Sequence, residues 1–317
     1  MKAPLVPLVV AALVLFSGAA NADEASTPWA GESPAKSRLI LESFEFTGAG
    51  DQRAGVQIKL APGWETYWRM PGTSGMPPRF DWSGSVNLAA EPELLWPAPR
   101  RAVAYSQKLN VYRDEVVFPL NLRAKDPSQP IELNLKLAFA VCKDVCVPVL
   151  AEHHMTLAPA SGAPEIDREN AILIQAYTGR TPTPDPESCG LSIRQVRAQR
   201  DGPNVALDIK MTGLSERRRP VVLIEGPDFA RASDVQAKPS GERGTWILRV
   251  GLGPATEANT LAGRRIRITV IDEGRALEQI WVVGASGSST AGLGLTPVSH
   301  RLLDPPEPGT RELSSLE

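Results

Sequence analysis

Two cysteines, Cys142 and Cys146, stand four positions apart in the segment AVCKDVCVPV, and the chain has only one other cysteine, Cys189. Residues four apart in a fully extended strand are separated by about 13 Å. A disulfide requires Cα atoms about 4.4–6.8 Å apart. If the two cysteines are joined, the chain must therefore reverse at residues 143–145. A three-residue hairpin loop does this, and the Lys-Asp pair in it is suitable turn chemistry.

A cysteine pair of this kind can be a structural staple, a redox-active dithiol or part of a metal site. Staples are common in exported proteins. A disulfide that closes so short a loop removes little chain entropy, however, and its stabilising effect is therefore small. Exposed loop tips are also where reducible disulfides occur. These arguments favour the redox pair and leave the staple as an alternative.

The metal alternative adds His153 and Met155 to Cys142 and Cys146, because thiolate and thioether ligands suit Cu(I). The spacing matches no standard zinc pattern. His153 and His154 are adjacent and would point to opposite faces of a strand, so both cannot easily join one site. A copper site therefore remains the weaker alternative.

The N-terminus indicates where these cysteines work. Residues 1–22, MKAPLVPLVVAALVLFSGAANA, contain Lys2, an apolar run over residues 5–16, and Ala20 and Ala22 on either side of an asparagine. This pattern is typical of a secretory signal peptide cleaved near Ala22. The apolar run is shorter than the roughly 20 residues that span a bilayer. We therefore expect an exported protein, with an uncleaved N-terminal anchor as the alternative.

The composition predicts a folded protein of about two domains. The chain has 317 residues, 42% of them hydrophobic and 22% charged. Its net charge of -2 gives no electrostatic basis for binding nucleic acid. The 29 prolines and 26 glycines divide the sequence into short runs, which favours strands over long helices.

Alternating apolar residues predict strands on both sides of a proline-rich segment. In the first half these strands are expected at residues 38–46, 54–64, 86–96, 116–124, 131–141 and 149–157. In the second half they are expected at residues 191–198, 204–211, 220–226, 245–252, 264–272 and 276–284. We therefore predict an all-β fold of two immunoglobulin-like antiparallel sandwiches, over residues 34–160 and 188–285.

Residues 161–187 are expected to join the two sandwiches as a short helix and a stiff linker. The helix is predicted over 165–180, with Ile166, Ala171, Ile174 and Tyr177 on one face. Three prolines in TPTPDPES then end it. Residues 286–317 are predicted to be disordered, since they have little periodic apolar content.

Two further features each allow two interpretations. Residues 63–85 combine many aromatic residues with turn-forming glycines and prolines, so they predict a rigid loop that either fills the core or covers the thiols. Cys189 is interpreted as a small buried hydrophobe, with a reactive or intermolecular thiol as the alternative.

Four stretches in order, GWETYW, DWSGS, VYRDEVVFPL and LAFAVCKDVCVPV, resemble the N-terminal periplasmic domain of the thiol:disulfide interchange protein DsbD. The sequence looks most similar to the DsbD-like exported proteins related to ScsB. The resemblance covers about residues 36–159, and for the second sandwich it rests on architecture alone. DsbD has five residues between its cysteines, whereas this chain has three.

The resemblance implies a function for the cysteine pair. In that family the two cysteines lie on facing strands of a hairpin, receive electrons from a membrane-embedded DsbD- or CcdA-like donor, and pass them to periplasmic thioredoxin-fold proteins. By resemblance, Cys142 and Cys146 take these roles, and Cys146 forms the mixed disulfide. The chain would then be a periplasmic thiol-disulfide oxidoreductase, similar to a protein-disulfide reductase, without a cofactor.

The resemblance also implies shielding residues. A cap loop in DsbD ends in an aromatic residue, which matches Tyr105. The acidic residues that precede that aromatic in DsbD match Val103 and Ala104, so no carboxylate stands there. Tyr67 matches a further aromatic near the site. The alternatives to an electron carrier are a copper-binding or copper-tolerance protein and a non-catalytic adhesion or scaffold module.

Overall fold

In the strands of this protein, buried side chains alternate with more exposed ones, and most of β9 (Ile131–Cys142) shows this pattern. The buried side chains of β9 are those of Ile131, Leu133, Leu135, Leu137, Phe139, Ala140 and Val141. Glu132 and Lys136, between them, are exposed. The strand therefore turns one face to a core, as a strand at the surface of a sandwich must.

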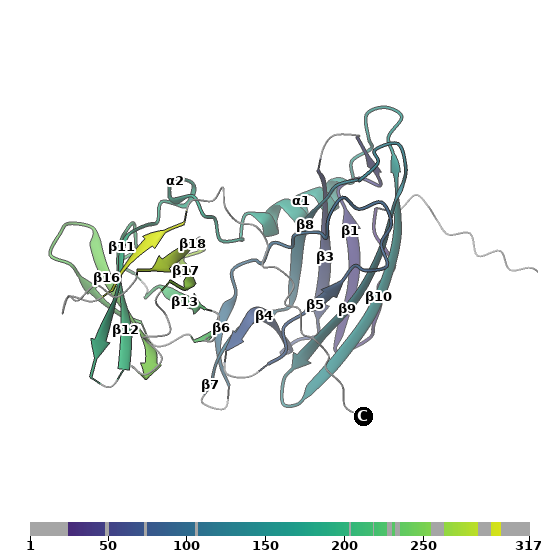
Figure 1. Cartoon of the computed structure of the whole chain (residues 1–317). Coiled ribbons are helices and arrows are strands. Elements are labelled where there is room, and N and C mark those ends of the chain that lie inside the picture. Colours follow the sequence, from purple (N-terminus) through teal and green to yellow (C-terminus); the bar gives the residue numbers. More distant parts are fainter. Residues whose placement is uncertain are drawn as a thin grey trace, which may run out of the picture.

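Figure 1 shows the computed structural model of the chain. It describes residues 25–47, 51–72, 75–104, 107–202, 204–217, 219–226, 230–231, 235–254, 263–284 and 293–298. The predicted signal peptide lies outside these residues. Among the described residues, no helix has the length and apolar character needed to cross a membrane.

The N-terminal domain is a sandwich of two sheets. One sheet has the order β1 (Ala35–Leu41), β3 (Gln52–Leu60), β8 (Glu115–Leu122). The other, here called the larger sheet because it is the larger of the two in this domain, has the order β2 (Glu45–Phe46), β10 (Cys146–Pro159), β9, β4 (Glu65–Gly72), β7 (Gln107–Arg113), β6 (Arg100–Ala104). The strand β5 (Arg79–Asp81) also pairs with β9. All these pairs are antiparallel except β2 with β10. The predicted all-β class is confirmed.

Large apolar side chains fill the space between the two sheets. Trp68, Phe118 and Phe139 are fully buried there. Phe80 and Trp96 pack edge to face on Phe118, with ring centroids 5.3 and 5.0 Å away. Edge-to-face contacts of this kind add to the stabilisation from burial.

Two segments of the N-terminal domain differ from the prediction. Residues 86–96 do not form a strand and make only single bridges, at Val86, Leu88 and Leu94. The aromatic segment 63–85 is not one rigid loop, because it contains β4 and β5. The reason is that aromatic residues fit strands as well as loops, so composition alone could not separate the two.

The helix α1 (Arg168–Thr178) begins later than predicted. The side chain of Asp167 accepts a hydrogen bond from the backbone N–H of Asn170 and caps the helix there. Ile174 and Tyr177 are buried, as predicted, and the helix packs against β8 and β3. Ile166 was placed wrongly on the buried face, since it precedes the cap and is 46% exposed.

The proline-rich linker is held against the second domain. Thr183 bridges to Leu277, its N–H donates to the carbonyl of Ala276, and its carbonyl accepts from the N–H of Glu278. A short helix, α2 (Pro186–Cys189), follows and is capped by the side chain of Asp185. The segment is therefore a packed connection and not a free extended spacer.

The second domain is a single sheet whose two halves enclose one core. One half contains β14 (Ala230–Arg231), β13 (Val221–Glu225), β17 (Arg265–Asp272) and β18 (Arg275–Val283). The other contains β11 (Ser192–Asp201), β12 (Asn204–Thr212), β16 (Thr245–Pro254) and β15 (Gln236–Pro239).

The strand β19 (Leu293–Pro297) joins these halves, because it pairs with both β18 and β11. The prediction that all of residues 286–317 are disordered is therefore wrong at β19. Leu295 is buried in the domain core, although the segment around it has too few apolar residues to signal a strand.

The two domains meet at β4 (Figure 1), and Arg69 of this strand contacts the second domain. Its guanidinium forms ion pairs with Glu225 of β13, at 2.7 Å, and with Glu278 of β18. All three side chains are at most 21% exposed. Leu223 of β13 is buried within the core cluster of the N-terminal domain. The contact is thus both ionic and apolar.

Candidate functional site

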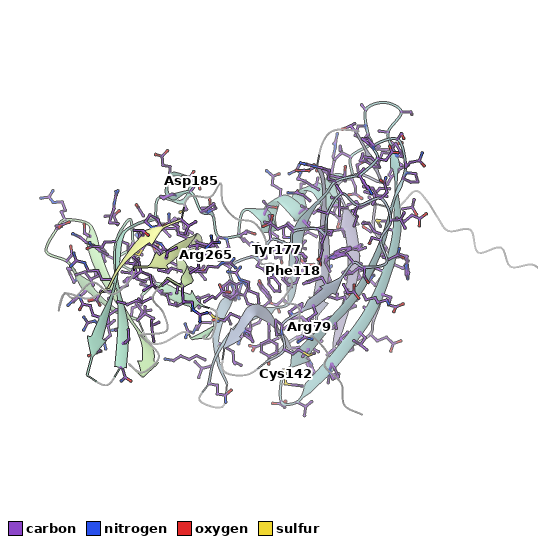
Figure 2. The ribbon with its side chains drawn as sticks, viewed as in Figure 1. Arg79, Phe118, Cys142, Tyr177, Asp185 and Arg265 are labelled. Atoms are coloured by element: carbon purple, nitrogen blue, oxygen red, sulfur yellow. A yellow bond between two sulfur atoms is a disulfide. The ribbon has the colours of Figure 1, made fainter. Side chains whose placement is uncertain are left out.

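Cys142 and Cys146 form a disulfide at the tip of the hairpin between β9 and β10. Cys142 ends β9, Cys146 begins β10, and the two are directly opposite each other with Cα atoms 4.1 Å apart. The N–H of Lys143 donates to the carbonyl of Val145 at 3.0 Å and closes the turn. Figure 2 shows the disulfide at the end of the larger sheet, away from α1. The chain reverses at residues 143–145, as a joined pair requires.

The two cysteines differ in exposure. Cys146 is exposed, whereas Cys142 is half-buried. Cys142 packs against a small group of buried side chains, here called the outer cluster, which consists of Tyr67, Ala102, Leu109, Val111 and Ala140. Of the two cysteines, Cys146 is therefore the more accessible to a protein that approaches the hairpin tip.

The outer cluster lies on the face of the larger sheet that points away from the main core. The alternation along β4 shows this, because Trp68 and Met70 belong to the main core whereas Tyr67 belongs to the outer cluster. The same alternation in β9 places Val141 in the core and Ala140 outside. The disulfide thus has its own apolar support, separate from the interior of the sandwich.

Tyr67 is the largest side chain of the outer cluster and is only 4% exposed. Gly75 covers its ring, since a Cβ atom at Gly75 would lie 2.5 Å from Cε1 of Tyr67. The backbone of Gly75 has φ of 115°, which also favours glycine. Burial, and then the charge of Glu65, raise the pKa of the Tyr67 phenol, so it stays neutral at physiological pH.

Charged side chains stand close to Cys142. Glu65 of β4 is directly opposite Cys142 of β9, and on its other side it is opposite Arg113 of β7, with which it forms an ion pair. Lys143 folds back over the turn between β3 and β4, because a Cβ atom at Gly63 would lie 3.2 Å from its Cε. The half-buried cysteine therefore has a carboxylate as its cross-strand neighbour.

The predicted cap residue Tyr105 lies outside the described residues. The strands that precede and follow it in the sequence, β6 and β7, pair with each other as far as Ala104 and Gln107. Ala102 of β6 and Leu109 of β7 both belong to the outer cluster. β6 and β7 thus each contribute an apolar side chain to the cluster that supports Cys142.

The residues of the metal alternative are not brought together. His153 is 2% exposed, and its ring nitrogens contact the hydroxyls of Ser37 at 3.0 Å and Thr27 at 3.3 Å. Burial, and then the proximity of His154, lower the pKa of His153 to about 4. His153 is seven positions from Cys146 along an extended strand, which is roughly 23 Å.

Met155 lies further along β10 and packs against the main core. Within the part of the chain that the structure describes, no group of three or more His, Cys, Asp or Glu side chains could hold a metal ion. The copper alternative therefore has no support in the positions of its predicted ligands.

Cys189 carries a free thiol in α2, with its sulfur 3.7 Å from the carbonyl oxygen of Asp185. It is half-buried and packs against the core of the second domain, in agreement with its interpretation as a small hydrophobe. In Figure 2, Asp185 and Cys142 lie far apart. Cys189 is thus not part of the site around the disulfide.

Residues 39–158 match the family model of the N-terminal domain of the thiol:disulfide interchange protein DsbD. The match includes both cysteines, Glu65 and Tyr67, and it confirms the resemblance predicted from the sequence. Residues 180–286 match a second family model, described as a domain of unknown function (DUF8393). No curated protein matches the chain.

The crystal structure of the N-terminal periplasmic domain of ScsB from Proteus mirabilis is similar to this structure, with a TM-score of 0.59 and 21% sequence identity. The similarity covers 83% of this chain and 100% of that one. Because the DsbD N-terminal match alone is much shorter, the shared fold extends over both domains.

Sequence reasoning missed Glu65 and Arg113 in the DsbD N-terminal-like domain. Both lie in motifs that carried the resemblance, GWETYW and VYRDEVVFPL, but neither was assigned to the site. Their relation to Cys142 depends on the pairing of β4 with β9 and β7, which joins segments distant in the sequence. The signal that could have found them is the alternation of GWETYW, which places Glu65 on the same face as Tyr67.

Proposed function

We propose that this chain is a periplasmic thiol-disulfide interchange protein in which Cys142 and Cys146 cycle between a disulfide and a dithiol. The observation that carries the proposal is the hairpin-tip disulfide, with one exposed cysteine, in a domain that matches the DsbD N-terminal family. The predicted signal peptide and the similarity to a periplasmic domain of ScsB support the location.

The chemistry is two successive thiol-disulfide exchanges. A thiolate of the electron donor attacks Sγ of Cys146 and forms a mixed disulfide, while the Cys142–Cys146 bond breaks and its electron pair leaves with Cys142. A second donor thiolate then attacks the donor sulfur of the mixed disulfide and releases Cys146. Two electrons and two protons are gained by the pair, and the donor becomes a disulfide.

The partners follow from this chemistry and from the family. We propose a membrane-embedded DsbD- or CcdA-like protein as the electron donor and periplasmic thioredoxin-fold proteins as acceptors. The acceptor step is the reverse exchange, in which Cys146 attacks the disulfide of the acceptor. We also propose that Tyr105 and Tyr67 shield the pair between encounters, since Tyr67 already packs beside Cys142.

The equilibrium redox potential of the pair tests the proposal. The protein without residues 1–22, carrying Cys189→Ser so that only the pair titrates, is equilibrated in glutathione or dithiothreitol buffers and its free thiols are alkylated. A potential between about -120 and -270 mV is expected, the range of exchange proteins. A value below about -300 mV would identify a structural staple and reject the exchange function.

A further inference from the structure

Four residues form a row across four strands of the larger sheet. Cys146 of β10 is opposite Cys142 of β9, Cys142 is opposite Glu65 of β4, and Glu65 is opposite Arg113 of β7. Residues directly opposite on antiparallel strands project to the same face, with Cβ atoms about 4.5–5.5 Å apart. The carboxylate of Glu65 and the sulfur of Cys142 are therefore neighbours on the outer face.

The surroundings of Glu65 let its charge act on this face. The Glu65 side chain is 17% exposed, so water screens it only in part. Its ion-pair partner Arg113 is 49% exposed and lies on the side away from the cysteines. The charge of Glu65 also raises the pKa of Tyr67, second to burial, and Tyr67 belongs to the cluster that contacts Cys142.

The two cysteines do not share this environment equally. Cys142 is half-buried and stands next to Glu65, whereas Cys146 is exposed and one strand further away. A neighbouring carboxylate and partial burial both disfavour a thiolate. Each effect therefore acts more strongly on Cys142 than on Cys146.

We propose that Glu65 is a positioning residue that disfavours the thiolate of Cys142 and so leaves Cys146 as the nucleophile of the reduced pair. The inference rests on the proposed exchange function and adds the group that makes the pair asymmetric.

The consequence for the exchange is a fixed order of attack. In the reduced pair, the Cys146 thiolate attacks one sulfur of an acceptor disulfide, and the other acceptor sulfur leaves as a thiolate. Cys142 must then lose its proton to solvent before it attacks Sγ of Cys146 and releases the acceptor as a dithiol. Glu65 disfavours this second ionisation, and the mixed disulfide always forms at Cys146.

The other charged groups around the site lie in the hairpin loop or on strands that do not pair with β9 at Cys142. Lys143 and Asp144 carry opposite charges in the hairpin loop, and Lys143 lies across the β3–β4 turn at Gly63. Arg113 faces Glu65 from β7, and Arg100 of β6 stands opposite Val111, one strand further from the cysteines. Glu65 is the carboxylate in register with Cys142.

Two variants with opposite effects on the local charge test the proposal, Glu65→Gln and Arg113→Gln, each in the full mature chain with Cys189→Ser. The reduced proteins are alkylated over a range of pH, and the rate at each cysteine is followed by mass spectrometry. We expect Glu65→Gln to lower the pKa of Cys142 by about one unit and Arg113→Gln to raise it. Glu65→Asp should retain the behaviour of the unchanged protein.

The opposite signs separate a charge effect from a structural one. Each variant breaks the same ion pair, so a purely structural role would move the pKa of Cys142 in the same direction in both. That result, an unchanged pKa in Glu65→Gln, or a lower pKa for Cys142 than for Cys146 in the unchanged protein would overturn the proposal. Circular dichroism of each variant verifies folding, and Arg113→Gln still decides the sign if Glu65→Gln does not fold.

The measurement also distinguishes the two proposals. Alkylation of the reduced protein needs no redox partner and reports only thiol ionisation. If the redox potential identifies a staple while Glu65→Gln shifts Cys142 as expected, the exchange function fails and the charge effect stands. If the potential lies in the exchange range and Cys142 does not shift, the function stands and the role of Glu65 is rejected.

Discussion

At the scale of single residues, the buried His153 connects the stability of the N-terminal domain to pH. Its ring is held between Thr27 and Ser37, and burial lowers its pKa to about 4 from an ordinary value of 6.5. The unfolded chain therefore binds a proton between pH 6.5 and 4 that the folded protein excludes. The contribution of neutral His153 to the free energy of unfolding is therefore complete above pH 6.5 and is lost as the pH falls toward 4.

We predict that the free energy of unfolding falls by about 2–3 kcal/mol between pH 7.5 and 4.5 through His153 alone. Urea unfolding at the two pH values measures it, with His153→Gln as the variant. The variant should lose this part of the pH dependence, whereas His154→Gln should keep most of it, because burial is the main cause of the lowered pKa of His153. Equal pH dependence in the unchanged protein and in His153→Gln would contradict the prediction.

The reversal of the chain at residues 143–145 could be predicted for a joined pair because the two cysteines are only four positions apart. Cys142 and Cys146 determine each other's geometry through the loop between them. The carboxylate opposite Cys142 was not predictable in this way, because nothing near Cys142 in the chain indicates Glu65. Which side chains meet across two paired strands depends on the register of the pairing. The sequence of one strand does not determine that register.

At the scale of secondary-structure elements, the outer face of β10 extends the surface around the disulfide. Pro148 and Leu150 follow Cys146 on this face and are both exposed, Leu150 by 82%. They pair with Ala140 and Ala138 of β9, so the surface beside the sulfurs is apolar over several rows. A partner that forms a mixed disulfide with Cys146 must lie against this surface.

We predict that Leu150→Glu slows reduction of the disulfide by thioredoxin, used as a probe, by about fivefold or more, a factor near 1 kcal/mol. Reduction by dithiothreitol should not change, because a small thiol does not touch Leu150. The matched control is Ile172→Glu, since Ile172 is 68% exposed on α1, which packs on the other sheet. An equal loss of rate in both variants, or with both reductants, would show that Leu150 has no docking role.

Elements were predictable where the alternation of apolar residues was strong. β9 has this alternation and appeared where expected, whereas β10 begins at Cys146, three residues before the predicted strand. Residues 86–96 have apolar residues too, but Pro92 and two glutamates interrupt the pattern, and they form single bridges only. β4 escaped prediction because its aromatic residues are surrounded by turn-forming residues.

At the scale of the whole molecule, β4 connects the disulfide site with the second domain. Glu65 and Tyr67 of this strand lie on the side of the cysteines. Two positions further along, Arg69 forms ion pairs with Glu225 and Glu278 of the second domain. The guanidinium lies over the ring of Trp68, 4.1 Å from its centroid, so it is fixed from both sides.

We predict that Arg69→Met lowers the free energy of unfolding by about 3 kcal/mol, because it leaves two carboxylates together in a poorly solvated contact. Thermal and urea unfolding measure the loss. Adding Glu225→Gln and Glu278→Gln should restore much of it, since the unpaired charges are then gone. A triple variant as unstable as Arg69→Met would mean that the loss comes from packing and not from charge.

The docking of the two domains had no signal in the sequence. Arg69, Glu225 and Glu278 each look like ordinary surface residues within strands. Only the packed arrangement of the domains gives them a common partially buried site. A division into two sandwiches could be inferred from the linker, but not the interface between them.

The position of β19 has a consequence for how the chain is made. This strand is the last described element of the second domain, yet it is the one that joins the two halves of the sheet. During synthesis, β11 and β18 are complete before β19 exists, and each then has an unpaired edge open to other chains. The sheet of this domain can therefore be completed only after residue 297 has left the ribosome. A nascent chain halted near residue 285 would expose two unpaired strand edges, on β11 and β18, that can pair with strands of other chains.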